Sequence, residues 1–201
     1  MPTATTTRAA RLGALAFIVR PAYIATEVIT AAATTGGYSF VTDSVSKLGE
    51  VGFSDGYSSP HHEVMNGSFV GFGVLMAGGA WLSNKELGPW VTGLLVISGA
   101  SSVATGLAPL DQDATLHAIA ATPLFVAQPL ALALLGPRLK HTQPRLAKAL
   151  LATGVVTAGA AVGFILAPEG SASGALERLA LWPVLFGLAG WAWGQRRAGV
   201  S

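Results

Sequence analysis

Apolar residues fill six long stretches of the chain, and polar residues collect between them. The stretches run near residues 11–34, 64–83, 89–109, 115–136, 146–167 and 176–195. A helix that crosses a bilayer needs about 20 mostly apolar residues, so each stretch predicts a transmembrane helix. The first is not a cleaved signal peptide, because Arg20 and Glu27 interrupt an apolar stretch that is too long for one. No linker divides the chain, which predicts one all-α domain of six membrane-spanning helices over residues 1–201.

Composition supports a membrane location. The chain has 201 residues, of which 51% are hydrophobic and 11% charged, whereas soluble domains carry about 25% charged residues. The 25 glycines suit membrane helices, in which glycine is more frequent than in soluble ones. These values exclude a soluble enzyme, a nucleic-acid-binding protein and a disordered chain, and they make the lipid bilayer the expected partner. Without cysteine, the chain has no disulfide and no thiolate metal ligand.

The signs of the charges predict an orientation, because Lys and Arg collect in short cytoplasmic loops. With the amino terminus placed inside, the cytoplasmic ends hold one acid, Glu86, and nine basic residues: Arg8, Arg11, Lys85, Arg138, Lys140, Arg145, Lys148, Arg196 and Arg197. The opposite ends hold Lys47 and Arg178 with eight acids: Asp43, Glu50, Asp55, Glu63, Asp111, Asp113, Glu169 and Glu177. Both termini are therefore expected in the cytoplasm of a bacterium, with the protein in its inner membrane.

The connection at residues 36–63 is much longer than the others. Loops beyond about 12–15 residues are usually functional or disordered. Within it, Asp43 and Ser44 precede an apolar residue and Gly49 follows, a pattern typical of a short capped helix. We therefore expect this outer loop to be ordered in part and to cover the outer mouth of the bundle.

Small residues recur at four-residue spacing in two spans. Gly67 and Gly71, and likewise Gly159 and Gly163, form GxxxG patterns that allow helices to approach closely. Packing inside the bundle is the favoured interpretation, and an oligomer face is the alternative.

Two charges lie inside the first span. An Arg deep in a span costs several kcal/mol unless it faces the protein interior and is paired. Arg20 either does so or extends to the cytoplasmic headgroups. Glu27 lies seven positions later on the same face and about 10 Å farther along the axis, so a direct pair with Arg20 needs either long side chains or a break at Pro21. Glu27 is expected to face a polar cavity that opens outward.

Polar side chains from several span ends meet the same membrane face. His117 begins the fourth span shortly after Asp111, and Glu177 and Arg178 begin the sixth. A zinc site could use His62, His117 and Asp111, although the sequence contains no HExxH motif. Ser46 with a histidine base could act as a nucleophile, although no GxSxG motif surrounds it. No motif identifies a cofactor.

Three short stretches resemble a bacterial membrane family, the domain of unknown function 998. They are Val45-Ser46-Lys47-Leu48-Gly49, then Leu107-Ala108-Pro109-Leu110-Asp111 with His117, and Gly174-Ala175-Leu176-Glu177-Arg178. The resemblance covers nearly the whole chain and implies the six-span arrangement. It gives no reaction, but it gives weight to Ser46, Asp111, His117, Glu177 and Arg178. The chain is also loosely similar to membrane hydrolases of the ceramidase kind. It lacks their paired-histidine spacing, so this similarity does not imply their activity.

The sequence favours a membrane protein with an outward-facing polar pocket that binds a lipid headgroup or a small solute. The predicted lining is Ser46, Asp111, His117, Glu177 and Arg178, with Glu27 and Arg20 deeper. A membrane-embedded hydrolase at the same face, metal-dependent or not, is the first alternative. A transporter and an accessory subunit are the others.

Overall fold

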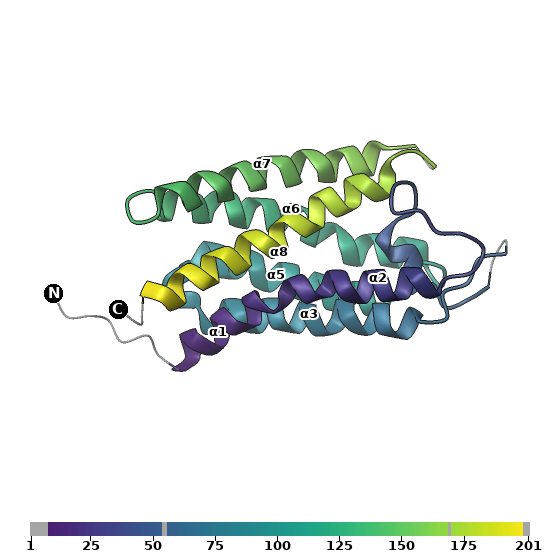
Figure 1. Ribbon diagram of the computed structural model, residues 1–201, viewed down its shortest axis with the longest axis horizontal. Coiled ribbons are helices and arrows are strands. Elements are labelled where there is room, and N and C mark those ends of the chain that lie inside the picture. The colour runs from purple at the N-terminus through teal and green to yellow at the C-terminus, as the bar shows by residue number, and fades with distance from the viewer. Residues whose placement is uncertain (1–7, 54–55, 169, 199–201) are drawn as a thin grey trace.

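A computed structural model of the chain describes residues 8–53, 56–168 and 170–198, without the side chains of residues 197 and 198. These residues form an elongated helical bundle (Figure 1). They include no strand, although Thr35 and Ser58 form an isolated β-bridge. The predicted all-α class is therefore confirmed.

The helices follow the apolar stretches closely. Their bounds are α1 (Arg8–Ile18), the 3-10 helix η1 (Arg20–Ala22), α2 (Tyr23–Ala33), the 3-10 helix η2 (Val45–Gly49), α3 (His62–Leu82), α4 (Asn84–Leu87), α5 (Pro89–Leu107), α6 (Ala114–Arg138), α7 (Pro144–Leu166) and α8 (Ser173–Ala198). Among the described residues, five segments are long and apolar enough to cross a membrane: Arg8–Ala33, α3, α5, α6 and α7. Charged residues near both ends of α8, including Glu177, Arg178 and Arg196, lower its mean hydropathy below that of these five.

The first span is interrupted near its middle. Pro21 has no N–H to donate, so the backbone tightens into η1, where the Ala22 N–H donates to the Val19 carbonyl over 3.0 Å. The Tyr23 N–H then donates to the carbonyls of Arg20 and Pro21. The break directs the Arg20 side chain toward α3, where it donates to the Phe72 carbonyl.

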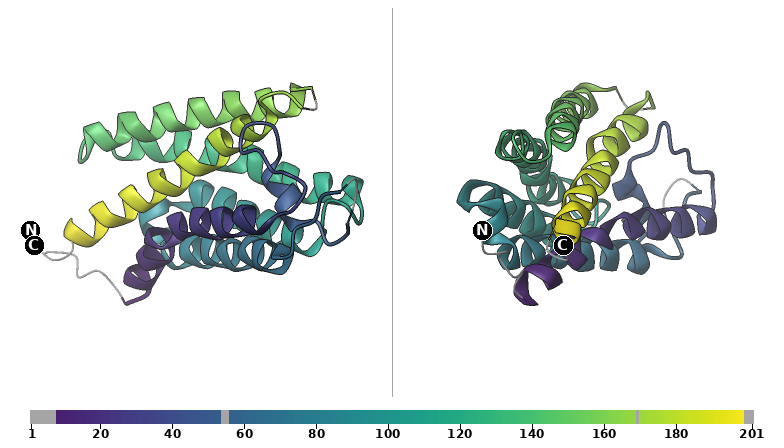
Figure 2. Two further views of the ribbon diagram at one scale, coloured as in Figure 1. Left: turned by 45° about the vertical axis from the view of Figure 1, so that its right-hand side comes forward. Right: turned by 60° about the vertical axis from the view of Figure 1, so that its left-hand side comes forward.

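Helices that follow one another in sequence also pack against one another. α3 contacts α5, α5 contacts α6, α6 contacts α7, and α7 contacts α8, which returns to α1. α8 runs obliquely across the bundle in both views of its long side (Figures 1 and 2). The larger core cluster includes Phe17, Leu95, Leu132 and Trp191. A smaller one lies where the loop between α2 and α3 meets the bundle.

Three of the four GxxxG glycines do not make the helix contacts predicted for them, whereas a Cβ at the fourth, Gly163, would lie 3.4 Å from Leu176 of α8. A Cβ added at Gly67, Gly71 or Gly159 would meet no atom within 4 Å, so these positions face away from neighbouring helices. The prediction of packing inside the bundle was wrong for them. The close approach of α3 to α5 instead occurs at Gly73 and Gly99, where a Cβ would lie 2.7 Å and 2.5 Å from the carbonyl oxygen of the other.

The two ends of the bundle differ. The start of α1 and the end of α8 lie at one end, and the loop of residues 34–61 between α2 and α3 lies at the other (Figure 1). We call residues 34–61 the α2–α3 loop. Most of the residues predicted to line a site lie in this loop or in the helix ends beside it.

Candidate functional site

The five-residue helix η2 lies at the centre of the α2–α3 loop. The Ser44 hydroxyl caps it by accepting the Lys47 N–H over 3.3 Å. Val45 and Leu48 are fully buried and belong to the smaller core cluster, in which Met65 of α3 also lies. Because these two apolar residues anchor η2 to the bundle, Ser46 between them is held at the rim and stays partly exposed.

Ser46 contacts His117 directly. The Ser46 Oγ lies 2.8 Å from His117 Nε2, and His117 Nδ1 lies 2.6 Å from the Ala108 carbonyl oxygen. His117 is only 5% exposed. A carbonyl oxygen can only accept, so Nδ1 carries the proton, and in a neutral ring Nε2 must accept from the serine hydroxyl. The contact is therefore a hydroxyl that donates to an oriented imidazole.

Side chains from the loop and from α3 hold the backbone that follows Ser46. They donate to three successive carbonyls: Tyr57 OH to Lys47 over 3.0 Å, Ser59 Oγ to Leu48 over 2.7 Å, and Asn66 Nδ2 to Gly49 over 2.8 Å. A Cβ on Gly49 would meet the Asn66 side-chain oxygen. A larger residue at this position would therefore have to displace the Asn66 amide from its hydrogen bond to the Gly49 carbonyl.

Asp111 lies in the loop between α5 and α6 and fixes the next two residues of the α2–α3 loop. Its carboxylate accepts the Val51 N–H over 3.1 Å and the Gly52 N–H over 2.8 Å. Partial burial raises the pKa of Asp111, but these backbone hydrogen bonds outweigh it and leave the pKa below its usual value. Asp111 therefore acts as a charged clamp on the loop.

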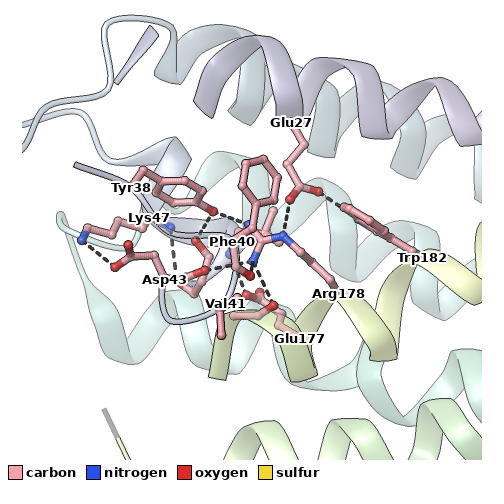
Figure 3. Close-up of polar contacts among 12 residues, drawn as sticks. Glu27, Tyr38, Phe40, Val41, Asp43, Lys47, Glu177, Arg178 and Trp182 are labelled. Carbon is pink, nitrogen blue, oxygen red and sulfur yellow. Dashed lines mark hydrogen bonds and ion pairs between the residues drawn. The ribbon is translucent and has the colours of Figure 1, made fainter. Parts of the chain in front are cut away.

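A buried ion pair joins the first span to α8 (Figure 3). Arg178 Nε lies 2.6 Å from Glu27 Oε1, and the two side chains are 6% and 0% exposed. The Trp182 indole N–H donates to the other carboxylate oxygen over 3.0 Å. Glu27 therefore pairs with Arg178, which lies on another helix 151 positions away in the sequence, and not with Arg20.

The rest of the Arg178 guanidinium binds the α2–α3 loop. Nη1 donates to the carbonyls of Phe40 and Asp43 over 2.9 and 3.0 Å and to Gly174 within α8, and Nη2 donates to the Tyr38 hydroxyl. Burial raises the pKa of Tyr38, so its neutral phenol can also donate to the Ser44 carbonyl. Arg178 therefore uses both terminal nitrogens on protein acceptors.

Glu177 binds the residue directly before Ser46. Its Oε2 accepts the Val45 N–H over 2.6 Å, and the side chain is almost completely buried. The two adjacent residues of α8 therefore both hold the loop, Glu177 at its N–H side and Arg178 at its carbonyls. The ligand-binding roles predicted for them stay predictions.

Arg20 faces the protein interior. It is 5% exposed, and its Nη1 donates to the Phe72 carbonyl over 2.7 Å. Its Nε is buried without a hydrogen-bond partner, as is the Tyr23 hydroxyl one turn later. Burial rules out extension of Arg20 to the headgroups in this structure, and its polar contact is a backbone carbonyl and not an acid.

The three residues considered as metal ligands each make a separate contact with the protein. His62 Nδ1 contacts the Ser59 carbonyl over 2.9 Å, while His117 and Asp111 make the contacts described above. Within the described part of the chain, no group of three or more His, Cys, Asp or Glu side chains is arranged to hold a metal ion.

Two contributors were missed in the sequence. Trp182 is not among the residues predicted to line the site, yet its indole N–H binds Glu27. An indole deep in a span needs an acceptor, and that requirement was the available signal. Tyr38, which binds Arg178, carried no comparable signal.

The three stretches that carry the family resemblance meet at the α2–α3 loop. The first contains η2 and Ser46, the second supplies Ala108 and Asp111, and the third supplies Glu177 and Arg178. In the third, a Cβ at Gly174 would collide with the Asp43 carbonyl.

Comparison with known proteins gives the family and nothing beyond it. The searches of curated proteins and of solved structures found no match. A family model described as a protein of unknown function, DUF998, matches residues 7–194. The expected family is thereby confirmed: the chain belongs to the DUF998 family, and its five long apolar helices are those of a membrane protein.

Proposed function

We propose that this membrane protein is a hydrolase of acyl esters in which Ser46 is the nucleophile and His117 is the general base. The observation that carries the proposal is the ordered contact from the Ser46 hydroxyl through the His117 ring to the Ala108 carbonyl. Serine is activated as a nucleophile when a base takes its proton and a third group orients that base. Here a backbone carbonyl is the orienting group.

The proposed reaction follows from these positions. The Ser46 oxygen attacks the ester carbonyl carbon while its proton passes to His117 Nε2. The carbon–oxygen bond to the alcohol breaks, and His117 returns the proton to the leaving oxygen. Water then attacks the acyl-serine with the same base, which releases the acid and restores the serine. Base catalysis of this kind contributes about 10²–10⁴-fold to a rate.

The fixed position of η2 supports this role. Hydrogen bonds to Val45, Lys47, Leu48 and Gly49 restrict the backbone on both sides of Ser46. Nucleophiles held in a reactive geometry avoid the entropy cost of reaching it. Ser46 is partly exposed while His117 is buried behind it, so a substrate, and then the hydrolytic water, can approach the base from the Ser46 side.

We further propose that α8 is the sixth span, that both termini are cytoplasmic, and that the α2–α3 loop faces outward from a bacterial inner membrane. The start of α1 and the end of α8 at one end of the bundle support this placement (Figure 1). Reporter fusions after Arg145 should then score cytoplasmic and fusions at Asp111 outside. A cytoplasmic score at Asp111 would reverse the arrangement.

Binding of a lipid headgroup or small solute without chemistry is the second candidate. It is supported by the exposed Asp111 carboxylate near the half-buried Glu50. Burial and then the nearby charge of Asp111 raise the pKa of Glu50. Two neighbouring carboxyl groups on this rim would favour a cationic group over an anionic one. Because the Arg178 donors are engaged by the protein, the ligand would meet the rim and not Arg178.

A fluorophosphonate probe that labels activated serines tests the first proposal. The wild-type protein in detergent should be labelled at Ser46, identified by mass spectrometry of its peptides. Ser46→Ala should abolish labelling, and so should His117→Gln, whose amide keeps hydrogen bonds but takes no proton. Ser58→Ala is the matched control, because Ser58 is a loop serine that contacts the Thr35 hydroxyl. Absence of labelling, or labelling at another serine, would contradict the hydrolase.

A further inference from the structure

The start of α8 forms a platform for the part of the α2–α3 loop that leads into Ser46. Its contacts span residues 38–45 and come from one and a half turns of helix. They are Ala175 N–H to Val41 O (2.9 Å), Ser173 Oγ to Thr42 O (2.8 Å), Arg178 Nη1 to Phe40 O and Asp43 O, Arg178 Nη2 to Tyr38 OH, and Val45 N–H to Glu177 Oε2 (2.6 Å). Figure 3 shows Glu177 and Arg178 of α8 directed toward the loop residues Tyr38, Phe40 and Asp43.

Glu177 makes the contact of this set that lies nearest to the candidate nucleophile. It accepts the N–H of the residue bonded directly to Ser46, and a hydrogen bond to a carboxylate is short and strong. Both Glu177 and Val45 are buried, at 3% and 0% exposure, so water cannot replace the bond. Because the two residues are 132 positions apart in sequence, only the docking of α8 supplies this acceptor.

The contact also has a direct effect on the reacting pair. The Ser46 Oγ to His117 Nε2 distance of 2.8 Å lies near the middle of the range for a hydrogen bond, which is lost beyond about 3.5 Å. A shift of η2 by about 1 Å would therefore separate the hydroxyl from its base. Shifts of that size can slow a reaction by about 10²-fold.

We propose that Glu177 is a positioning residue that sets the Ser46 oxygen against His117 through the Val45 N–H. The inference rests on the proposed function and adds α8 to its machinery. Glu177 does not touch the substrate. It fixes the backbone from which the nucleophile extends.

Two substitutions separate positioning from folding. Glu177→Leu removes the acceptor, and Glu177→Gln keeps a neutral oxygen that can accept the same N–H. We expect Glu177→Leu to slow fluorophosphonate labelling of Ser46 by about tenfold or more and Glu177→Gln to restore most of the rate. Glu63→Leu, an exposed acid on the first turn of α3, is the control and should label at the wild-type rate. Equal rates for Glu177→Leu and wild type would overturn the proposal.

A double-mutant cycle identifies the bond itself. Val45→Pro removes the donor, and proline is compatible with this position because Val45 is the first residue of η2 and Ser44 is extended. If Glu177 acts through this N–H, Glu177→Leu should have no further effect on labelling in the Val45→Pro background. Independent, additive effects would show that Glu177 acts by another route.

A spectroscopic measurement keeps the test separate from activity. In protein labelled with ¹⁵N-histidine, the His117 Nε2 resonance reports the hydrogen bond from Ser46, and Ser46→Ala assigns its shift. Glu177→Leu should move this resonance toward the Ser46→Ala value, and Glu177→Gln should not. If wild type is never labelled, the hydrolase fails, but this shift still tests positioning. An unchanged resonance in Glu177→Leu would refute it.

Discussion

The buried pair of Glu27 and Arg178 allows the loss in the free energy of unfolding to be predicted for a variant that lacks one partner. In Arg178→Leu, the Glu27 carboxylate keeps one donor, the Trp182 indole, inside the bundle. Removal of one partner of a buried pair costs about 3–5 kcal/mol, because the remaining charge is left uncompensated. The loop carbonyls of Phe40 and Asp43 also lose their donor. We therefore expect Arg178→Leu to lower the free energy of unfolding by at least the lower end of that range.

The assay is reversible unfolding in mixed micelles, followed by tryptophan fluorescence, for the two single variants and the double variant Glu27→Leu/Arg178→Leu. Removing both charges removes the uncompensated one, so the double variant should be less destabilised than the two single variants added together. Groups in contact typically show a coupling of about 0.5–3 kcal/mol. Lys47→Ala is the comparison, because the Lys47–Asp43 pair is partly exposed, and such pairs contribute about 0–1 kcal/mol. A coupling of zero would refute the assignment of Glu27 and Arg178 as partners.

Three further predictions concern other contacts. Gly174→Ala should destabilise the protein by about 1–3 kcal/mol in the same unfolding assay, because its Cβ would meet the loop backbone, whereas Gly159→Ala in open space should be neutral or stabilising. Arg20→Met should raise the unfolding temperature, because it removes a buried charge and an unpartnered N–H; a fall would indicate a counter-ion that this chain does not supply. The clamp of Asp111 on Gly52 should weaken in acid. A lowered pKa means that the stabilisation is present above the unfolded pKa of about 3.9 and is lost as pH falls through the folded value, so the protection of the Gly52 N–H from hydrogen exchange, taken relative to the intrinsic rate at each pH, should fall there.

Apolar length alone located the long helices within a few residues. The stretch expected at 89–109 is the helix Pro89–Leu107, because a proline at the first turn and a glycine before it fix the start. The same rule did not give the path of a helix within the bundle. The GxxxG glycines were assigned to helix contacts, but whether a glycine faces a neighbour depends on rotation about the helix axis, which small residues on several faces of α3 leave undetermined.

The candidate site could likewise be predicted only in part. The types of residue and the end of the bundle could be predicted, because polar groups at span ends share a face. The partners could not, since Glu27 had a cation nearby in sequence, Arg20, and the actual partner was 151 residues away. Pairing between residues so far apart in sequence depends on how α8 packs against the first span. The hydropathy pattern does not predict which helices pack together.

The polar contacts around η2 are more than the attachment of a loop requires. Val45 and Leu48 are fully buried and would by themselves hold η2 against α3 through apolar burial. Buried polar groups add little net stability, because each bond to protein replaces a bond to water, and an unsatisfied one costs more than it returns. What such bonds do add is geometry: each restricts one backbone group in direction as well as in distance. A segment whose N–H and carbonyl groups are fixed in this way has one partly exposed hydroxyl, that of Ser46, and its partner is the one buried histidine ring of the described chain. Fixing a reactive side chain is a role that accounts for such restraint, and for this reason we propose η2 as the functional site of the protein.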